Sequence, residues 1–427
     1  MKKVMAINKA FNIFYCLLSY FIFMFFRALN SAYLIPAKSQ SVLNVFTSAF
    51  LFGAMFLIAY MMPKRKLFYH KGVYIIFTGI ALWLGWGIFA SLSRLTLHDS
   101  VALRELIALT AFSFTLFYTL RIAIFYDLRL RLLEITLFIL SILFIAAYIT
   151  HFDNFALFRA GNLFKVMNNA ERYRNAYGLG HPNGAGMLCL NFFLMKAAYK
   201  SFLEARNVTE ATSTPKYNLF YKYLSLIQVI VLIILLSTGS RSSITGLILS
   251  IMVYYAIVFY QKISSYIRII FITFAIIAAF LIITLVDWQL VYTLSNRAVN
   301  YTILPLLTRN NSWITGFGFF RAYDENMIRI IQIPVLDSFY LYILLESGLL
   351  GCLFLFGAIL CFSYLYFRDI KHMTKSHIIS GCILIAMLYH GIFESNLYGH
   401  GPYDLITWIL FISCLNERIP QKHRPQN

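Results

Sequence analysis

Apolar runs of about 20 residues dominate the chain, and short polar stretches rich in Lys and Arg separate them. A helix needs about 20 apolar residues to cross the hydrocarbon core of a bilayer, because each residue advances it by about 1.5 Å. Twelve runs approach this length and predict about 12 transmembrane helices. They cover residues 10–26, 42–62, 73–92, 101–120, 132–150, 183–203, 219–236, 242–260, 268–286, 338–366, 377–397 and 402–416.

The composition agrees with this pattern. Of the 427 residues, 60% are hydrophobic and 12% are charged, and the mean hydropathy is +0.72. Soluble domains average about 25% charged residues, so much of this chain must face something other than water. The first apolar run is too long for a signal peptide and lacks a small-residue cleavage site. The sequence predicts an all-α polytopic membrane protein with a single transmembrane domain over residues 1–427.

The positions of the cations predict which side each connection occupies. Cytoplasmic connections are enriched in Lys and Arg, and 23 of the 36 such residues fall inside if both termini are cytoplasmic. The two longest connections, 151–182 and 287–337, then lie outside. Even-numbered spans start on that outer side.

The formal net charge of +19 does not indicate a nucleic-acid partner. Nucleic-acid-binding proteins gather basic residues on one water-exposed domain, whereas here they interrupt apolar runs. The six cysteines lie within apolar segments and show no CxxC spacing. They predict neither a disulfide framework nor a metal site, and no cofactor motif occurs.

The type of cation differs between the two sides. The predicted inner side has 14 Lys and 9 Arg, and the outer side has 2 Lys and 11 Arg. Arg is planar, always charged and bidentate toward phosphate, so this bias indicates an outer site for a phosphate or diphosphate. The alternative is that these arginines extend from helix ends to the interface. The outer arginines are Arg27, Arg94, Arg104, Arg159, Arg172, Arg174, Arg241, Arg297, Arg309, Arg321 and Arg329.

The connection into the sixth span has the sequence ERYRNAYGLGHPNG over residues 171–184. It places Arg172 and Arg174 shortly before Pro182, a residue that suits the first turn of a helix. Since this helix would start outside, its free N–H groups and positive dipole end would point outward.

The connection between the seventh and eighth spans is the hydroxyl-rich turn STGSRSS, residues 237–243. Arg241 stands at an outward helix N-terminus, where an anion would meet both the guanidinium and backbone donors. Ser240 and Ser242 are more often helix caps. Arg241 has no acidic neighbour in sequence that would give it a local partner.

The long connection 287–337 contains many aromatic residues and is expected to form a folded cap with a short amphipathic helix around 289–307. Its GFGFF segment, residues 316–320, lacks the strand and helix context of a nucleotide site. The tenth span follows it and opens with Asp337, a candidate general base or a helix N-cap. Glu346 lies deeper in this span, where a charge is costly unless partnered.

In the eleventh span, His390 and Glu394 are four residues apart and would share one helical face. A histidine held by a carboxylate can act as a base, although a buried histidine with a structural role is more common. Both residues are second-tier candidates.

Three ordered stretches resemble the O-antigen ligase and polymerase superfamily, and in particular bacterial capsule or exopolysaccharide repeat-unit polymerases. They are RNAYGLGHPN (174–183), STGSRS (237–242), and the passage from GFGFF (316–320) to DSFYLYILLESGLLGCLF (337–354). The resemblance covers roughly residues 170–360.

The resemblance implies a multi-pass glycosyltransferase of the bacterial cytoplasmic membrane with an extracytoplasmic site. Its substrates would be undecaprenyl-diphosphate-linked oligosaccharides, joined by inverting, metal-independent transfer. A flippase and a chain-length regulator would be partners. The family's diphosphate-binding arginines carry over to Arg241 and Arg174.

We therefore expect Arg241 and Asp337 to be catalytic. The expected substrate-binding residues are Arg172, Arg174, His181, Asn183, Arg309 and Arg321. The ligase branch has a His-Asn pair where this chain has Asp337-Ser338, which argues against a ligase and leaves open whether a dedicated base exists. A flippase of the same lipids is the alternative from another class, but such proteins usually consist of two related halves, and no inverted repeat is evident.

Overall fold

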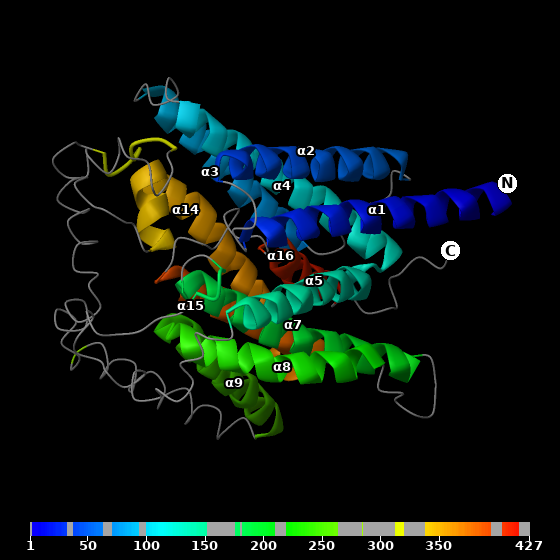
Figure 1. Ribbon diagram of the computed structural model, residues 1–427. Coiled ribbons are helices and arrows are strands. Elements are labelled where there is room, and N and C mark those ends of the chain that lie inside the picture. The colour runs from blue at the N-terminus through cyan, green and yellow to red at the C-terminus, as the bar shows by residue number, and fades with distance from the viewer. Residues whose placement is uncertain are drawn as a thin grey trace.

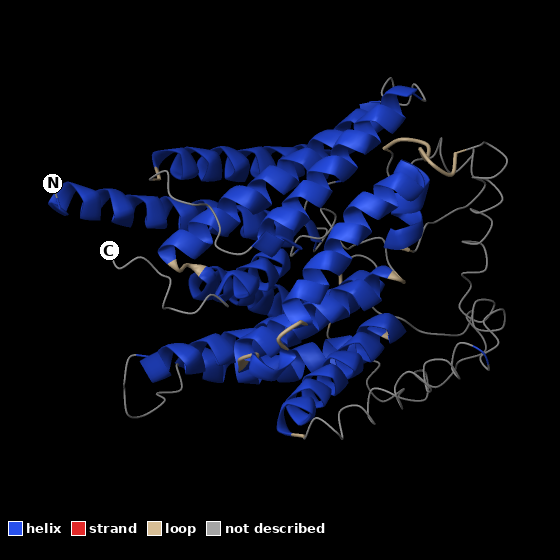
Figure 2. Ribbon diagram, turned by 180° about the vertical axis from the view of Figure 1, so that it is seen from behind, coloured by secondary structure: helices blue, strands red, loops and turns tan. Residues whose placement is uncertain are grey.

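The computed structural model describes residues 2–31, 37–62, 71–93, 100–151, 176–179, 182–209, 219–263, 284, 312–319, 338–393 and 404–417. All regular secondary structure within these ranges is helical (Figure 2). The helices are α1 (Lys2–Ser31), α2 (Ala37–Met61), α3 (Lys71–Ser93), α4 (Ser100–Tyr126), α5 (Arg129–Thr150), α7 (Pro182–Thr209), α8 (Leu219–Thr238), α9 (Arg241–Lys262), α14 (Phe339–Phe367), the 3₁₀ turn η5 (Ile370–His372), α15 (Lys375–Gly391) and α16 (Asp404–Glu417).

Each predicted span except 268–286 overlaps one of these α-helices, and 268–286 lies almost entirely outside the described residues. Among the described residues, seven helices are long and apolar enough to cross a membrane, and Val45–Met61 and Asp404–Cys414 are shorter apolar helices. The described chain is therefore a bundle of apolar helices, as expected for a polytopic membrane protein (Figure 1). The amphipathic helix expected at 289–307 also lies outside the described residues.

Contacts between helices establish their directions. Arg27 contacts Ser48 while Cys16 contacts Met55, so α1 and α2 are antiparallel. At the other extreme of the chain, α15 begins where α14 ends, because the Tyr366 hydroxyl donates to the carbonyl of His377. The N-terminal end of α1 and the C-terminal end of α16 lie at the same end of the bundle (Figure 1). We call this the termini end, and the other the far end.

Helices α9 and α14 are consecutive among the described elements and run in the same direction. Arg241 begins α9 at the far end, and Gln261 near its C-terminus donates to the carbonyl oxygens of Ile370 and Met373 at the termini end. Helix α14 also begins at the far end, since Tyr340 donates to the carbonyl of Leu388 near the C-terminus of α15.

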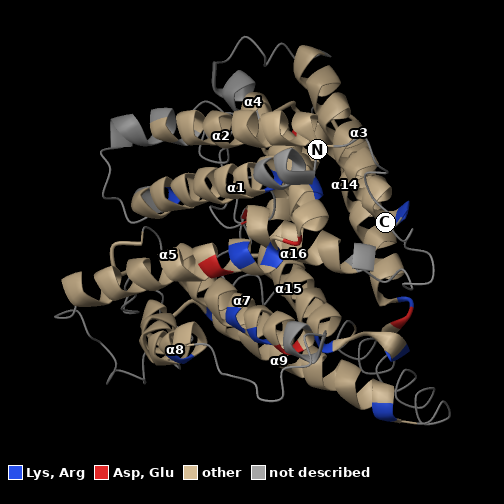
Figure 3. Ribbon diagram, turned by 90° about the vertical axis from the view of Figure 1, so that its right-hand side faces the viewer, with Lys and Arg blue, Asp and Glu red and all other residues tan. Residues whose placement is uncertain are grey.

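The charged side chains of the described residues gather at the termini end. Figure 3 looks onto this end, where coloured charged positions lie over α5, α7 and α9. Arg129 and Arg131 open α5, and Lys262 closes α9. This is the side that the cation count assigns to the cytoplasm.

Apolar side chains cover the outside of the bundle as well as its core. The exposed ones include Leu226, Val229 and Leu232 of α8 and Ile251 and Met252 of α9. Such a surface suits contact with lipid. Inside, the largest fully buried side chains include Trp83, Tyr20, Tyr342 and Trp408.

Helices α3 and α14 pack together more extensively than any other described pair. Gly79 makes the approach possible, because a Cβ atom there would lie 2.1 Å from the Cβ of Ala358 and 2.8 Å from the carbonyl oxygen of Phe354. Close approach at small residues is how membrane helices gain van der Waals contact without a hydrophobic driving force. Helix α14 is the scaffold for the segment described below.

Candidate functional site

The turn between α8 and α9 forms the base of the site at the far end. Helix α8 ends at Thr238, and Gly239 reverses the chain with φ of 58°. The N–H of Ser240 donates to Thr238 Oγ1 at 3.2 Å. Ser240 then occupies the N-cap position of α9, and Arg241 is its first residue.

Arg241 is exposed at this helix N-terminus, as predicted. Among the described residues, no acidic side chain forms an ion pair with it. A helix N-terminus offers unpaired N–H groups and the positive end of the dipole, so an anion bound here would meet both these groups and the guanidinium.

The serines of the turn do not cap the helix as expected. The Ser240 side chain makes no capping hydrogen bond. Its hydroxyl instead lies 2.9 Å from that of Ser243 and 3.4 Å from that of Ser242. Ser243 Oγ also lies 3.4 Å from Nε2 of His390, which is buried. The N-terminal end of α9 and the C-terminal end of α15 therefore meet in a small buried polar cluster.

The N-terminal part of helix α7 packs against this cluster. A Cβ at Gly186 would lie 2.5 Å from the Cβ of Ser240 and 2.8 Å from Oγ of Ser243. Asn183, a predicted substrate-binding residue, is half-buried one turn earlier. Pro182 is the first residue of α7, as predicted. The structure thus brings Asn183, Arg241 and His390 to the same far end.

A second contact between α9 and α15 lies one turn along α9. The hydroxyls of Thr245 and Tyr389 are 2.7 Å apart. Thr245 Oγ1 also donates to the carbonyl oxygen of Arg241 at 2.6 Å. The Tyr389 ring packs against α9 at Gly246, where a Cβ would lie 3.6 Å from the ring.

The segment before α7 forms a tight turn in its described part, residues 176–179. Tyr177 has φ of 49° and is buried, and Gly178 has φ of 68°. A Cβ at Gly178 would lie 2.8 Å from the ring of His151 at the end of α5. A non-glycine residue with positive φ is strained and needs surrounding structure to hold it, and here this part of the RNAYGLGHPN motif packs against His151 at the end of α5.

The GFGFF motif docks onto an interruption in α14. Gly348 breaks that helix with φ of 61° and ψ of −166°. Residues 312–319 lie across the break, and Gly316, with φ of 69°, faces Gly348 so closely that a Cβ on it would lie 2.6 Å from the Gly348 nitrogen. Neither position has room for a side chain.

Hydrogen bonds from this segment replace those that the break removes. The Phe317 N–H donates to the carbonyl of Leu345 at 2.7 Å, and the Gly318 N–H donates to that of Glu346 at 2.9 Å. The Leu349 N–H donates to the carbonyl of Trp313 at 2.7 Å. Backbone groups at membrane depth need protein partners, and here the chain itself supplies them. Glu346 is fully buried at this junction.

The segment is also held by α3. The N–H of Phe319 donates to Ser91 Oγ at 2.8 Å, and its ring meets that of Trp83 edge-on at 6.0 Å. The ring fits over Gly87, where a Cβ would lie 2.3 Å from it. Of the aromatic residues in the 287–337 connection, the described Trp313, Phe317 and Phe319 thus serve packing.

Two predictions about helix ends need correction. Ser338, rather than Asp337, occupies the N-cap position of α14. Helix α15 ends at Gly391 rather than at 397, because the N–H groups of Ile392 and Phe393 turn back to the carbonyls of Tyr389 and His390. Glu394 lies outside the described residues, so its pairing with His390 stays a prediction.

Seven predicted site residues lie outside the described part of the chain. They are Arg172, Arg174, His181, Arg309, Arg321, Asp337 and Glu394. Their roles stay predictions.

Another outer arginine lies within the protein. Arg27 near the end of α1 donates to Ser48 Oγ at 2.8 Å and interacts electrostatically with Asp404, a buried residue at the start of α16. Its ring contact is with Phe23, 5.3 Å from the guanidinium carbon to the ring centroid. The charge of Arg27 therefore has partners inside the bundle, which is neither the outer anion site nor the interfacial position considered from the sequence.

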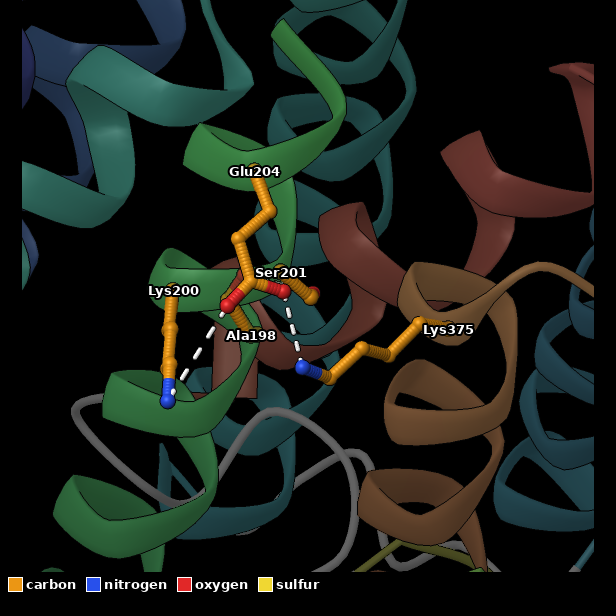
Figure 4. Close-up of polar contacts among 5 residues, drawn as sticks. All are labelled: Ala198, Lys200, Ser201, Glu204 and Lys375. Carbon is orange, nitrogen blue, oxygen red and sulfur yellow. Dashed lines mark hydrogen bonds and ion pairs between the residues drawn. The ribbon is translucent and has the colours of Figure 1, made fainter. Parts of the chain in front are cut away.

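At the termini end, one ion pair links α15 to α7. Glu204 lies between two lysines, with one carboxylate oxygen 2.7 Å from Lys375 Nζ and the other 3.9 Å from Lys200 Nζ (Figure 4). The hydrogen bond from Lys375 to Glu204 raises the pKa of Lys375 above its usual value. Helix α15 is thus tied to α7 at one end and to α9 at the other.

The sequence analysis missed Tyr389, Thr245 and Ser243 as parts of this site. Tyr389 precedes His390, and Thr245 stands four residues after Arg241, so both could be found only by asking which neighbours share a face with a suspected residue. No sequence pattern predicted the contact of His151 with Gly178.

No protein-family model matches the chain, and neither a curated protein nor a solved structure matches it. The resemblance to the O-antigen ligase and polymerase superfamily therefore rests on its ordered motifs.

Proposed function

We propose that this protein is a polysaccharide polymerase of the bacterial cytoplasmic membrane. It would join undecaprenyl-diphosphate-linked oligosaccharide repeat units on the outer face. The observation that carries the proposal is Arg241, an exposed guanidinium at the N-terminus of α9 without an ion-pair partner among the described residues. It stands at the far end of the bundle, opposite the end where charged residues gather (Figure 3).

The reaction requires stabilisation of a developing negative charge, which such a group can provide. A hydroxyl oxygen of the acceptor sugar attacks the anomeric carbon of the donor glycan, and a new C–O bond forms with inversion. The bond from that carbon to the lipid diphosphate breaks, and its electron pair leaves with the diphosphate. The hydroxyl proton passes to a base or to water. Because negative charge develops on the departing diphosphate, fixed donors aimed at it stabilise the transition state.

The surroundings of Arg241 suit this task. Fixed donors stabilise a transition state better than mobile ones, because they need not reorganise during the reaction. The turn that carries Arg241 is packed against α7 at Gly186 and bonded to α15 through Ser243 and Thr245. Asn183 at the start of α7 adds a polar side chain near this end.

Purified protein in liposomes with lipid-linked repeat units tests the proposal. We expect longer glycans to form, and we expect Arg241→Ala to slow elongation by about 100-fold or more, the cost of removing one such donor. Arg241→Lys keeps the charge but loses the bidentate fork, and should restore activity only in part. Arg368→Ala removes an exposed arginine at the termini end and serves as the matched control.

The other outcomes identify the alternatives. Movement of the lipid between leaflets without elongation would indicate a flippase, and transfer of glycan to a different acceptor would indicate a ligase. Discontinuous transporter helices leave backbone groups free for substrate or ions. In α14 the Ser312–Phe319 segment bonds to backbone groups on both sides of the break, which favours a structural break. Normal chain length from the Arg241→Ala protein would contradict the catalytic role.

A further inference from the structure

The last turn of α15 contacts the first turn of α9 at two points, and one of them leads directly to Arg241. Tyr389 and His390 are adjacent in sequence, and they reach Thr245 and Ser243.

Counting protons gives the direction of the Tyr389 contact. A threonine hydroxyl has one proton to donate. Thr245 donates it to the carbonyl oxygen of Arg241 at 2.6 Å, the shortest contact it makes. At the 2.7 Å contact with Tyr389, Thr245 Oγ1 is therefore the acceptor and the phenol is the donor. The result is a directed chain from the Tyr389 hydroxyl through Thr245 to the backbone of Arg241.

We infer that Tyr389 is a positioning residue, which holds the first turn of α9 through Thr245 and so fixes the base from which Arg241 reaches its anion. The contact between His390 and Ser243 also holds the first turn of α9 against α15. The inference rests on the proposed function only for its activity assay.

This support lies at the start of α9, which packs mainly against α15 and α7. Helix α9 makes few contacts with its sequence neighbour α8, and much of its surface faces outward, including Ile248, Ile251 and Tyr255. The first turn of a helix also lacks partners for its own N–H groups. At this turn the Thr245 hydroxyl bonds the carbonyl oxygen of Arg241, so the Tyr389 hydroxyl is linked through Thr245 to the backbone that carries Arg241.

Four variants separate positioning from general packing. Tyr389→Phe removes only the hydroxyl. Thr245→Val removes both links of the chain at nearly constant volume, and Thr245→Ser retains them. Tyr366→Phe is the matched control, because it removes a phenol hydroxyl that bonds α15 at its opposite end, at the carbonyl of His377.

Amide hydrogen exchange over residues 241–247 is the first readout, and it needs no activity. We expect exchange there to rise about three- to tenfold in Tyr389→Phe and Thr245→Val, which corresponds to the loss of one hydrogen bond. Thr245→Ser and Tyr366→Phe should match the wild type in this segment. Because Tyr389 acts through Thr245, the double variant Tyr389→Phe/Thr245→Val should exchange no faster than Thr245→Val alone.

Elongation kinetics are the second readout. We expect kcat to fall about three- to tenfold in Tyr389→Phe, while KM for the lipid-linked donor changes less than twofold, because the fixed donor matters most as charge develops. Wild-type exchange in Tyr389→Phe, or additive effects in the double variant, would overturn the inference. If the wild-type protein does not elongate glycans, the proposed function fails, and the exchange experiment still decides the role of Tyr389.

Discussion

The indole Nε1 of Trp86 donates a 2.9 Å hydrogen bond to the carbonyl oxygen of Ser347, the residue immediately before the break in α14. The carbonyls of Leu345 and Glu346 accept from the docked segment, so three successive carbonyls before Gly348 have donors from outside the helix. Trp86 belongs to α3, which also binds the segment through Ser91. Helix α3, helix α14 and residues 312–319 therefore all bond to one another at the break.

Gly348→Ala should destabilise the protein strongly. A side chain at φ of 61° costs about 1–2 kcal/mol in backbone energy. The new Cβ would also lie 2.3 Å from the carbonyl oxygen of Ile314. We expect a loss of more than about 2 kcal/mol, seen as a lower melting temperature of the detergent-purified protein. An unchanged melting temperature would show that the docked segment is not bound as described.

Gly79→Ala and Gly85→Ala form a matched pair on α3. At Gly79 the added Cβ would meet Ala358 and the backbone of Phe354, whereas at Gly85 nothing lies within 4 Å. We expect Gly79→Ala to separate α3 from α14 and lower the melting temperature. Gly85→Ala should be neutral or stabilising by about 0.5–1 kcal/mol, since alanine favours the helix. Equal effects of the two substitutions would contradict the packing of α3 on α14.

Orientation can be measured by labelling introduced cysteines in intact cells. With the far end outside, Arg241→Cys should react with a membrane-impermeant maleimide, and Lys371→Cys at the termini end should react only after permeabilisation. The wild-type protein, with its native cysteines, gives the background. Labelling in the reverse order would place Arg241 in the cytoplasm and remove the basis of the proposed function.

The ion pair of Lys375 and Glu204 should contribute little and should not depend on pH near neutrality. The two side chains are 46% and 43% exposed, and exposed pairs are worth about 0–1 kcal/mol. The pKa of Lys375 is raised from its usual 10.5, so its contribution is complete below that pH and is lost only as pH rises further.

Glu204→Gln should therefore lower the melting temperature slightly and by the same amount at pH 7 and pH 9. A difference between wild type and variant that changes across this range would show that another group titrates at the pair.

The apolar pattern predicted the helices well, because the length of a membrane span and its lack of charge are properties of a continuous segment. It predicted less well where a helix ends for local reasons. No feature of the sequence from residue 377 to 397 predicts the turn after Gly391, because this turn depends on backbone hydrogen bonds to His390 and Tyr389. The break at Gly348 was likewise not predicted, because residues 338–366 form one continuous apolar run.

The candidate site was predictable in part. The position of Arg241 followed from a short turn and a helix start, both local features. Its supports did not, because Ser243 and His390 are 147 residues apart, and Thr245 and Tyr389 are 144 apart. Such pairs depend on which helices pack side by side, and α9 and α15 are separated in sequence by α14.

The N-terminal end of α1 and the C-terminal end of α16 lie at one end of the bundle, and this has a practical use. A peptide linker could connect the end of one copy to the beginning of a second without passing through the bilayer. Such a fused tandem, with Arg241 replaced in one half only, would reveal whether each copy works alone or whether neighbouring copies share their task.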